Sequence, residues 1–426
     1  MSVERSRGYY RPELETMDPE ARQAYLDRRV AEIVAHAYEH SPAFRRRMDE
    51  AGAAPGDITS VEALRKLPPI NKAQLLEIQR SDPPFGGLLA TTPERLRRVY
   101  VSPGPIYEPG EEVYDDDRWV QAFYAAGFRP GDVAQVTFNF NMVPFAFWLD
   151  ESLRKMGCQC IPAGVGNTEL QVQIMKELGV TAYLGTPSFL AAIRDKARAM
   201  GLDPRTDLKL EVGFVAAEML PESLRAELEE DFGMTIRQAY GTADVGCLSY
   251  ECYHLGGMHF AQDCLVEIID PVTGEPKGPG EPGEVVGTSF SKVYPIIRYA
   301  TGDLSAYTDE PCECGRTSPK LTRIMGRVDA FTKIKGMFVH PSGVEQVAAK
   351  FPQIEAFQLV VERSGHQDVM RLECELVADA SPSEELARAI AEVMKEILRL
   401  SGEVRFVPRG SLGPQPKVID DRRKWD

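Results

Sequence analysis

The chain has 426 residues, of which 43% are hydrophobic and 27% charged, a composition typical of folded globular proteins and a length that favours two or more domains. Its net charge of −15 argues against a general nucleic-acid binder or a binder of anionic membranes, because both surfaces repel an acidic protein. It has no apolar run near the roughly 20 residues that cross a bilayer. Residues 1–20 lack the apolar core of a signal peptide, so we expect a cytoplasmic location.

The N-terminal region is predicted to be helical. Apolar residues recur at spacings of three and four across residues 12–50, and Gly52 follows as a stop signal. Leu67-Pro68-Pro69 then breaks the chain before another short helix.

Strands and helices alternate between residues 97 and 300. The pattern predicts strands over 132–140, 158–164, 180–187, 208–218 and 234–241. Helices are predicted between them, over 147–157, 169–179, 188–201 and 221–233. Such alternation with short links indicates a mostly parallel sheet with helices on its faces.

The residue pattern changes twice in the second half of the chain. Residues 263–290 are punctuated by Gly and Pro and alternate as antiparallel strands do, whereas 333–408 predict a small α+β module. We therefore predict an α/β protein. Residues 1–326 would form a large N-terminal domain, with parallel α/β sheets plus an antiparallel β region, and 327–426 a small C-terminal α+β domain.

Three segments carry residues suited to nucleotide chemistry. The first, 238–244, sits at the C-terminal end of a predicted strand, where ligands bind in open α/β sheets, although an ordinary polar turn is the alternative. The second is Arg298-Tyr299-Ala300-Thr301-Gly302-Asp303, in which a carboxylate after a Gly turn can accept from both hydroxyls of a ribose; a solvated turn is the alternative. The third, 326–336, places charges and glycine at the expected domain boundary, where a hinge would need them.

In this order and at this spacing, the three segments resemble the adenylate-forming superfamily, and within it the phenylacetate–CoA ligase family with its coenzyme F390 synthetase relatives. The likeness extends over nearly the whole chain and is most specific over 298–344. It implies that ATP and a carboxylic acid form an acyl-adenylate and pyrophosphate, after which a thiol, usually CoA, displaces AMP. It also implies a C-terminal domain that swings between the two steps.

The resemblance assigns roles to individual residues. Catalytic roles fall to Lys417, and to Thr242 and Asp244, which would approach the phosphates and Mg²⁺. Asp329 would lie at the hinge. Residues implied to contact ATP or AMP are Ser102, Ala217, Glu218, Tyr240, Gly241, Asp303, Arg316 and Arg327.

The chain departs from the family pattern in three places. The family's phosphate loop is normally rich in Ser, Thr and Gly and ends in Gly-Lys-Pro. The matching stretch here is 100–109, in which prolines remove backbone donors and Glu108 stands in place of the lysine. The metal-binding glutamate is Asp244, preceded by Ala243 instead of a hydroxyl residue. Near the C-terminus, Lys417 matches either the catalytic lysine or a structural arginine, because the segment is shortened.

Five of the eight cysteines lie within residues 247–314. Cys252, His259, Cys312 and Cys314 make a Cys₃His set suited to tetrahedral, structural Zn²⁺, and the resemblance includes relatives with this pattern. The two halves are about 53 residues apart but flank the same antiparallel region. Small buried residues without a metal are the alternative; other candidate ligands are Cys247, His254, Asp263 and Cys264.

An aromatic stretch follows the first predicted strand of the parallel sheet. Core packing explains most of it, while the family places its carboxylate pocket nearby, which favours an aromatic or other apolar-tailed acid. The stretch comprises Phe138, Phe140, Met142, Pro144, Phe145 and Phe147, with Asn139 and Asn141 between them.

The main prediction is thus an acid–CoA ligase that uses ATP, Mg²⁺ and CoA. Two other functions stay open: an adenylating enzyme that loads a carrier protein or forms an amide, and a degenerate nucleotide-binding protein that has lost ligation. The expected partners are a small carboxylic acid and CoA, with no nucleic acid and no membrane. Family members are often homodimers, which the residues themselves do not indicate.

Overall fold

In a computed structural model, the chain divides into two compact units, Met1–Ile324 and Met325–Asp426. The residues that the structure describes are 4–110, 116–328, 332–334, 337–339, 341–364, 367–413 and 416–423. The division falls two residues before the expected boundary after residue 326. None of the helices in these ranges combines the length and apolarity needed to cross a membrane.

The N-terminal region is helical, as predicted, but prolines divide it into α1 (Pro12–Glu15), α2 (Pro19–His40) and α3 (Pro42–Glu50). Pro19 and Pro42 each occupy a first helical position, where a missing N–H costs little. The residues before them cap the helices: Asp18 accepts from the Glu20 N–H, and Ser41 from the Phe44 N–H. Short elements follow at η1 (Pro55–Asp57), α4 (Val61–Leu64), β1 (Ile70–Asn71), α5 (Lys72–Ser81) and η2 (Pro93–Arg95).

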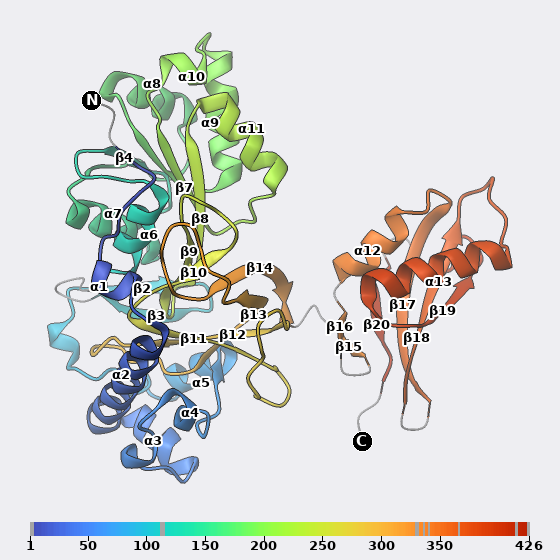
Figure 1. Cartoon of the computed structure of the whole chain (residues 1–426), viewed down its shortest axis with the longest axis horizontal. Coiled ribbons are helices and arrows are strands. Elements are labelled where there is room, and N and C mark those ends of the chain that lie inside the picture. Colours follow the sequence, from blue (N-terminus) through green and yellow to red (C-terminus); the bar gives the residue numbers. More distant parts are fainter. Residues whose placement is uncertain are drawn as a thin grey trace. The chain divides into compact units, whose positions relative to one another are not determined.

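The parallel half of the main sheet confirms the predicted alternation (Figure 1). Its strands run in the order β8-β7-β6-β4-β5, with parallel pairing throughout. Their bounds are β4 (Val133–Val136), β5 (Gln159–Pro162), β6 (Ala182–Gly185), β7 (Val212–Val215) and β8 (Thr235–Thr242). Helix α6 (Arg118–Ala126) precedes β4, and the helices between the strands are α7 (Phe145–Met156), α8 (Thr168–Leu178), α9 (Pro187–Ala199), α10 (Pro204–Asp207) and α11 (Glu222–Phe232). Gly157 and Gly179 end α7 and α8 in the left-handed conformation, as predicted.

Helices cover both faces of this parallel half. Successive residues of a strand point to opposite faces. On β6, Leu184 packs into the core formed with α6 and α7, whereas Tyr183 packs into the core formed with α8, α9 and α11. The near-continuous burial of β6 and β7 follows from this double cover.

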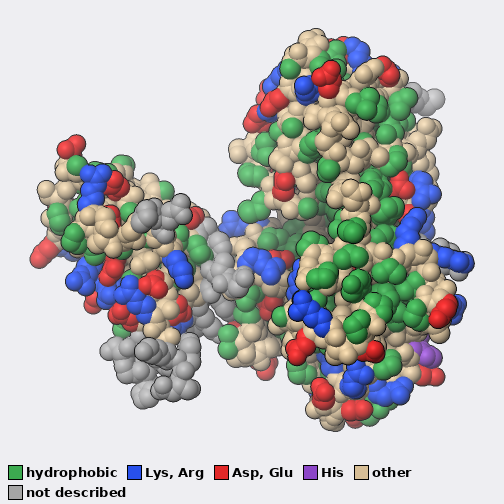
Figure 2. All heavy atoms as spheres, turned by 180° about the vertical axis from the view of Figure 1, so that it is seen from behind, with side chains coloured by type: hydrophobic (Ala, Val, Ile, Leu, Met, Phe, Trp, Pro, Cys, Tyr) green, Lys and Arg blue, Asp and Glu red, His purple; other side chains and the backbone are tan. Residues whose placement is uncertain are grey.

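Beyond β8 the sheet becomes antiparallel, in the order β11-β12-β13-β14-β10-β9-β8. The added strands are β9 (Gly246–Glu251), β10 (Met258–Phe260), β11 (Cys264–Ile269), β12 (Gly283–Ser289), β13 (Tyr299–Thr308) and β14 (Lys320–Arg327). A separate hairpin of β2 (Arg98–Ser102) and β3 (Ile106–Gly110) occupies the stretch that was expected to be a phosphate loop. Acidic and basic side chains are intermingled on the visible face of the N-terminal unit, around a band of hydrophobic and uncharged ones (Figure 2).

The C-terminal unit has an α+β fold, as predicted. Its four-stranded sheet has the order β19-β18-β17-β20, and residues of its two helices share a buried core with those strands. The elements are β15 (Thr332–Ile334), β16 (Met337–Val339), α12 (Pro341–Ala349), β17 (Ile354–Ser364), β18 (Gln367–Leu376), α13 (Glu384–Leu398), β19 (Glu403–Phe406) and β20 (Ile419–Asp421).

A buried arginine of the antiparallel half, Arg298, forms an ion pair there and a hydrogen bond to the N-terminal region. The Arg298 guanidinium contacts the Glu267 carboxylate at 3.0 Å and donates to the Leu67 carbonyl at 2.8 Å, and Arg298 is only 1% exposed. Removing one partner of such a pair leaves a buried charge without compensation.

We therefore expect Glu267→Gln to lower the free energy of unfolding by about 3 kcal/mol. Urea unfolding followed by tryptophan fluorescence measures this, since Trp119 and Trp148 both lie in the N-terminal unit. The matched control is Glu32→Gln, which breaks an exposed pair with Arg28 and should cost less than about 0.5 kcal/mol. Equal effects of the two substitutions would contradict the structural role of the Arg298–Glu267 pair.

Candidate functional site

The candidate site begins where β8 ends and the sheet changes from parallel to antiparallel. Residues 238–244 span the end of β8 and the turn to β9, which returns antiparallel along β8. The end of β7 lies beside it, because β7 and β8 pair in parallel. Crevices at such carboxyl ends are where ligands bind in open α/β sheets.

Two motif residues far apart in the sequence meet here. The Tyr240 hydroxyl donates to Asp303 Oδ2 at 2.8 Å and lies 3.0 Å from Thr301 Oγ1. The Thr301 hydroxyl donates to the Val285 carbonyl and accepts from the Asp303 N–H, which fixes the turn. These hydrogen bonds join residues of β8, β12 and β13, and they hold the Asp303 carboxylate beside the Tyr240 side chain.

The backbone after β7 is strained. Ala217 has φ +69°, a conformation that is uncommon for residues other than glycine and that clusters at binding sites. Next to it, the Glu218 carboxylate accepts from the Ser188 hydroxyl at 2.9 Å and from the Ser188 N–H at 3.2 Å. Ala217 and Glu218 are both exposed, as residues that border a ligand must be.

The turn after β8 holds a half-buried carboxyl group, that of Asp244. Burial raises its pKa, while a hydrogen bond from Tyr299 and the positive charge of Lys72 act in the opposite direction. Thr242, two residues earlier, accepts from the Val245 N–H at 3.3 Å. The sequence motif therefore places a hydroxyl and a carboxyl group in one short turn.

The hairpin β2–β3 brings a second carboxyl group, that of Glu108. Glu108 is 2% exposed, and its Oε2 accepts from the Ser102 hydroxyl at 2.8 Å. Among the described residues, its Oε1 has no hydrogen-bond partner. Burial, and to a smaller extent the Asp244 charge, raise the pKa of Glu108 to about 8.

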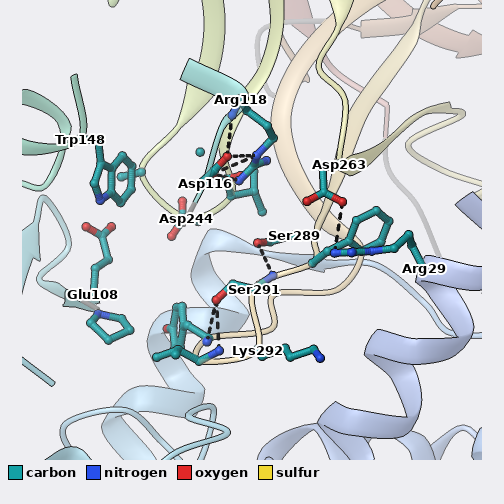
Figure 3. A pocket seen from close by; sticks show the side chains of 17 residues that line it. Arg29, Glu108, Asp116, Arg118, Trp148, Asp244, Asp263, Ser289, Ser291 and Lys292 are labelled. Carbon is teal, nitrogen blue, oxygen red and sulfur yellow. Dashed lines mark hydrogen bonds and ion pairs between the residues drawn. The ribbon is translucent and has the colours of Figure 1, made fainter. Parts of the chain in front are cut away.

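Of these groups, Glu108 and Asp244 line a cavity of about 430 Å³, the size of a small-molecule site (Figure 3), whereas the Tyr240–Asp303 pair and the Ala217-Glu218 turn lie outside its lining. Glu108, Trp148 and Asp244 lie on one side of it, and Arg29 and Asp263 on the other. The remaining lining residues are Pro109, Asp116, Arg118, Ala243, Val245, Gly246, Ser289, Phe290, Ser291, Lys292, Val293 and Tyr294. Among the charged lining residues, Asp244 has a predicted catalytic role, Glu108 is the departure from the family loop and Asp263 is an alternative metal ligand. The sequence analysis did not single out the other four, which are Arg29, Asp116, Arg118 and Lys292.

The aromatic stretch after β4 mostly packs on itself. Phe138 contacts Phe145 at 4.8 Å between ring centroids, and Phe140 contacts Phe147 at 5.1 Å. Met142 is 71% exposed, and Trp148, on the next turn of α7, is the aromatic residue of this region that lines the cavity.

The four predicted zinc ligands come together, with ligand atoms within 4.8 Å of one another. Cys252 Sγ lies 3.7 Å from Cys312 Sγ, and Cys314 Sγ lies 3.4 Å from His259 Nε2. A tetrahedron with Zn–S bonds of ~2.3 Å has edges of about 3.8 Å. The sheet explains the meeting, since Cys252 follows β9, His259 lies on β10, and both cysteines of the second pair precede β14, which pairs with β10.

The surroundings of this cluster also suit a metal. His259 Nδ1 lies 3.3 Å from the Ser318 carbonyl, which orients Nε2 toward the thiols. Hydrogen bonding by the Cys252 thiol, and next by His259, lowers the pKa of Cys314. The other candidate ligands have different partners: Cys247 contacts the Ser249 carbonyl, Cys264 the Ala261 carbonyl, His254 the Glu313 carboxylate, and Asp263 the side chains of Arg29 and Tyr25.

Arg316 lies next to the cysteines, in a buried ion pair. Its guanidinium contacts Glu15 Oε2 at 2.7 Å, with both side chains almost fully buried. The Tyr9 hydroxyl donates to the Cys314 carbonyl at 2.8 Å, and Arg316 stacks over the Tyr9 ring. The structure therefore engages Arg316 with the N-terminal segment instead of leaving it at the Tyr240–Asp303 network.

The remaining predicted residues belong to the C-terminal unit. Arg327 is the last residue of β14, and Asp329 lies outside the described residues. Lys417 has an exposed side chain just before β20, and its carbonyl accepts from the Gln358 amide at 2.9 Å.

Comparison with known proteins identifies related chains. Residues 151–291 match a family described as AMP-binding enzyme, and residues 336–422 match the AMP-binding enzyme C-terminal domain. The phenylacetate-coenzyme A ligase of Thermus thermophilus is 32% identical, over 86% of this chain and 84% of that one. The enzyme of the same name from Pseudomonas putida is 30% identical, over 94% and 93%.

Solved structures show the same fold. An open conformation of 2-hydroxyisobutyryl-CoA ligase, in complex with 2-HIB-AMP and CoA, has a TM-score of 0.86 at 24% identity, over 97% of this chain and 93% of that one. The same ligase in its postadenylation state has a TM-score of 0.72 at 25% identity, over 96% and 92%. Given the identity over most of both chains and the two matched domains, the protein belongs to the phenylacetate–CoA ligase family of AMP-forming acid–CoA ligases.

Proposed function

We propose that the chain activates an aromatic or other apolar-tailed carboxylic acid, with Tyr240 and Asp303 holding the nucleotide. As a member of its family it is an ATP-dependent acid–CoA ligase, which forms an acyl-adenylate and then transfers the acyl group to CoA. The proposal concerns which residues do this and which acids are taken.

The observation that carries the proposal is the contact between Tyr240 and Asp303. A carboxylate that a tyrosine hydroxyl holds in place can accept from both hydroxyls of a ribose, and charged hydrogen bonds of this kind are among the strong ones. The Tyr240 ring, Gly241 and the strained Ala217-Glu218 turn would border the adenine. A ribose on Asp303 would direct the phosphates toward Thr242 and Asp244 in the turn after β8.

The acid would enter beside Trp148, whose indole supplies an apolar wall of the cavity. Mg²⁺ would offset the negative charge that develops on the α-phosphate during attack, with Asp244 as a ligand and Thr242 nearby. Lys417 is proposed as the cation that assists adenylation, and Asp329 and Arg327 as the hinge and a nucleotide contact. Ser102 is proposed to act near the phosphates through Glu108, its hydrogen-bond partner, and Arg316 is left out of the nucleotide site because its guanidinium pairs with Glu15.

The Cys₃His cluster is proposed as a structural Zn²⁺ site. The four ligand atoms have spacings near those of a zinc tetrahedron, and a fully protein-ligated zinc has a structural role. It would fix the loop between β13 and β14, which also contacts the N-terminal segment through Cys314 and Arg316. A cytoplasmic location and a homodimer stay predictions.

Pyrophosphate release with a panel of aryl, branched short-chain and linear acids tests the proposed function. We expect release to be highest with aryl or apolar-tailed acids and to yield a thioester only when CoA is present. Adenylate without thioester would favour the carrier-protein or amide-forming enzyme. Nucleotide binding without pyrophosphate release for any acid would favour the degenerate protein, which Glu108 keeps in consideration.

Asp303→Asn should lower kcat/KM for ATP by about 10- to 100-fold, because it weakens hydrogen bonds worth about 1.5–3 kcal/mol. Asn keeps an acceptor for the Tyr240 hydroxyl, so the thermal unfolding midpoint should change little. Asp309→Asn, at an exposed carboxylate just past β13, is the matched control. Steady-state kinetics in which both variants behave alike would refute the ribose role.

The purified chain should contain about one zinc ion, by metal analysis, in a site of four protein ligands. Cys314→Ser should bring the zinc content near zero and lower the thermal unfolding midpoint, since structural zinc contributes directly to folding. Cys160→Ser is the control, because the Cys160 thiol contacts the Asp150 carbonyl outside the cluster. Wild-type protein with almost no zinc, or a Cys314→Ser variant that keeps it, would rule out the site.

A further inference from the structure

The side chain of Glu108 raises a question that the family pattern does not answer. It stands where the family loop has a lysine, yet it lies 98% buried at the edge of the proposed phosphate site. The Ser102 hydroxyl fixes Oε2, and within the described part of the chain Oε1 is left without a partner. A buried carboxyl oxygen without a hydrogen-bond partner is costly, so a ligand that satisfies it is expected.

Other acidic side chains of the same cavity are already compensated. Asp116 accepts from Arg118 at 2.8 Å, and Asp263 pairs with Arg29 at 3.1 Å. By contrast, Glu108 and Asp244 form no ion pair with any residue in the described ranges, although the positive charge of Lys72 acts on both. Within the described ranges, the acidic lining residues that have no cationic partner in an ion pair are therefore those on one side of the cavity, Glu108 and Asp244 (Figure 3).

Glu108 and Asp244 lie near enough for the charge of one to act on the other, and both line the cavity. They approach from separate elements, the strand β3 and the turn after β8, so they can take up a ligand between them. The two carboxylates and the nearby Ser102 hydroxyl are hard oxygen donors, the kind that Mg²⁺ and Mn²⁺ prefer.

We propose that Glu108 Oε1 and Asp244 together bind a divalent cation, and that this cation replaces the loop lysine as the positive charge for the ATP phosphates. The replacement rests on the proposed function, whereas the binding of the cation to the two carboxylates does not. It explains how a loop with a glutamate serves an anionic substrate: the bound cation lies between the carboxylates and the phosphates and is attracted to both.

Mn²⁺, titrated into the nucleotide-free full chain and followed by electron paramagnetic resonance, tests this inference. We expect the wild type to bind Mn²⁺, and Glu108→Gln and Asp244→Asn each to weaken binding by at least about tenfold. Asp263→Asn, which changes a carboxylate of the same cavity that Arg29 already compensates, should bind as the wild type does. Glu108→Gln keeps the shape of the side chain, so an unchanged thermal unfolding midpoint shows that the loss is not one of folding.

A wild type that binds no Mn²⁺, or a Glu108→Gln variant that binds it as tightly as the wild type, would overturn the inference. Pyrophosphate release distinguishes this failure from that of the proposed function. If the chain releases pyrophosphate but the Glu108→Gln substitution leaves its Mn²⁺ affinity unchanged, only the cation site is rejected. Mn²⁺ binding that depends on Glu108, in a chain that releases no pyrophosphate, supports the cation site and rejects the ligase assignment of the cavity.

Discussion

A change of strand direction at β8 positions the site residues of the N-terminal unit. β8 pairs in parallel with β7 on one side and antiparallel with β9 on the other. Its carboxyl end therefore closes the layered α/β half and opens the antiparallel half within a few residues. This single position brings the turn after β7, the turn after β8 and the start of β13 to one edge, although Tyr240 and Asp303 are 63 residues apart.

The N-terminal segment braces the same arrangement from outside. Arg5 pairs with Asp132 at 2.7 Å at the start of β4, while Glu15 pairs with Arg316 beside the cysteine cluster. Residues 5–15 thus connect the parallel half to the loop between β13 and β14. A zinc ion in the cluster would stiffen the end of this connection that lies next to the strand carrying Asp303.

Much of this could be predicted from the sequence, because periodicity and residue chemistry are local. The sequence predicts the β–α alternation, the glycines that end α7 and α8, and the Cys₃His set. Prolines at 19 and 42 divide a continuous helical pattern into separate helices, which the periodicity alone did not distinguish. The buried partner of Arg316 was not legible, since Glu15 lies about 300 residues away and looks like any acidic residue of a helical segment.

The environment of Glu108 was the other limit. The sequence marks a glutamate where the family has lysine, and by itself this indicates a loop that repels phosphate. Only the structure shows that the carboxyl group is buried, that Ser102 holds one oxygen and that Asp244 lies close by. The sequence alone indicates that Glu108 repels the phosphates. The structure indicates instead that Glu108 needs a cation, which would attract them.

We propose that the site at the end of β8 makes an acyl-adenylate and passes the acyl group to CoA. Mass spectrometry of a reaction of the purified chain with ATP, CoA and an aryl acid tests this proposal. We expect equal amounts of AMP and acyl-CoA thioester. Formation of ADP, or of AMP without any acyl-CoA, would contradict it.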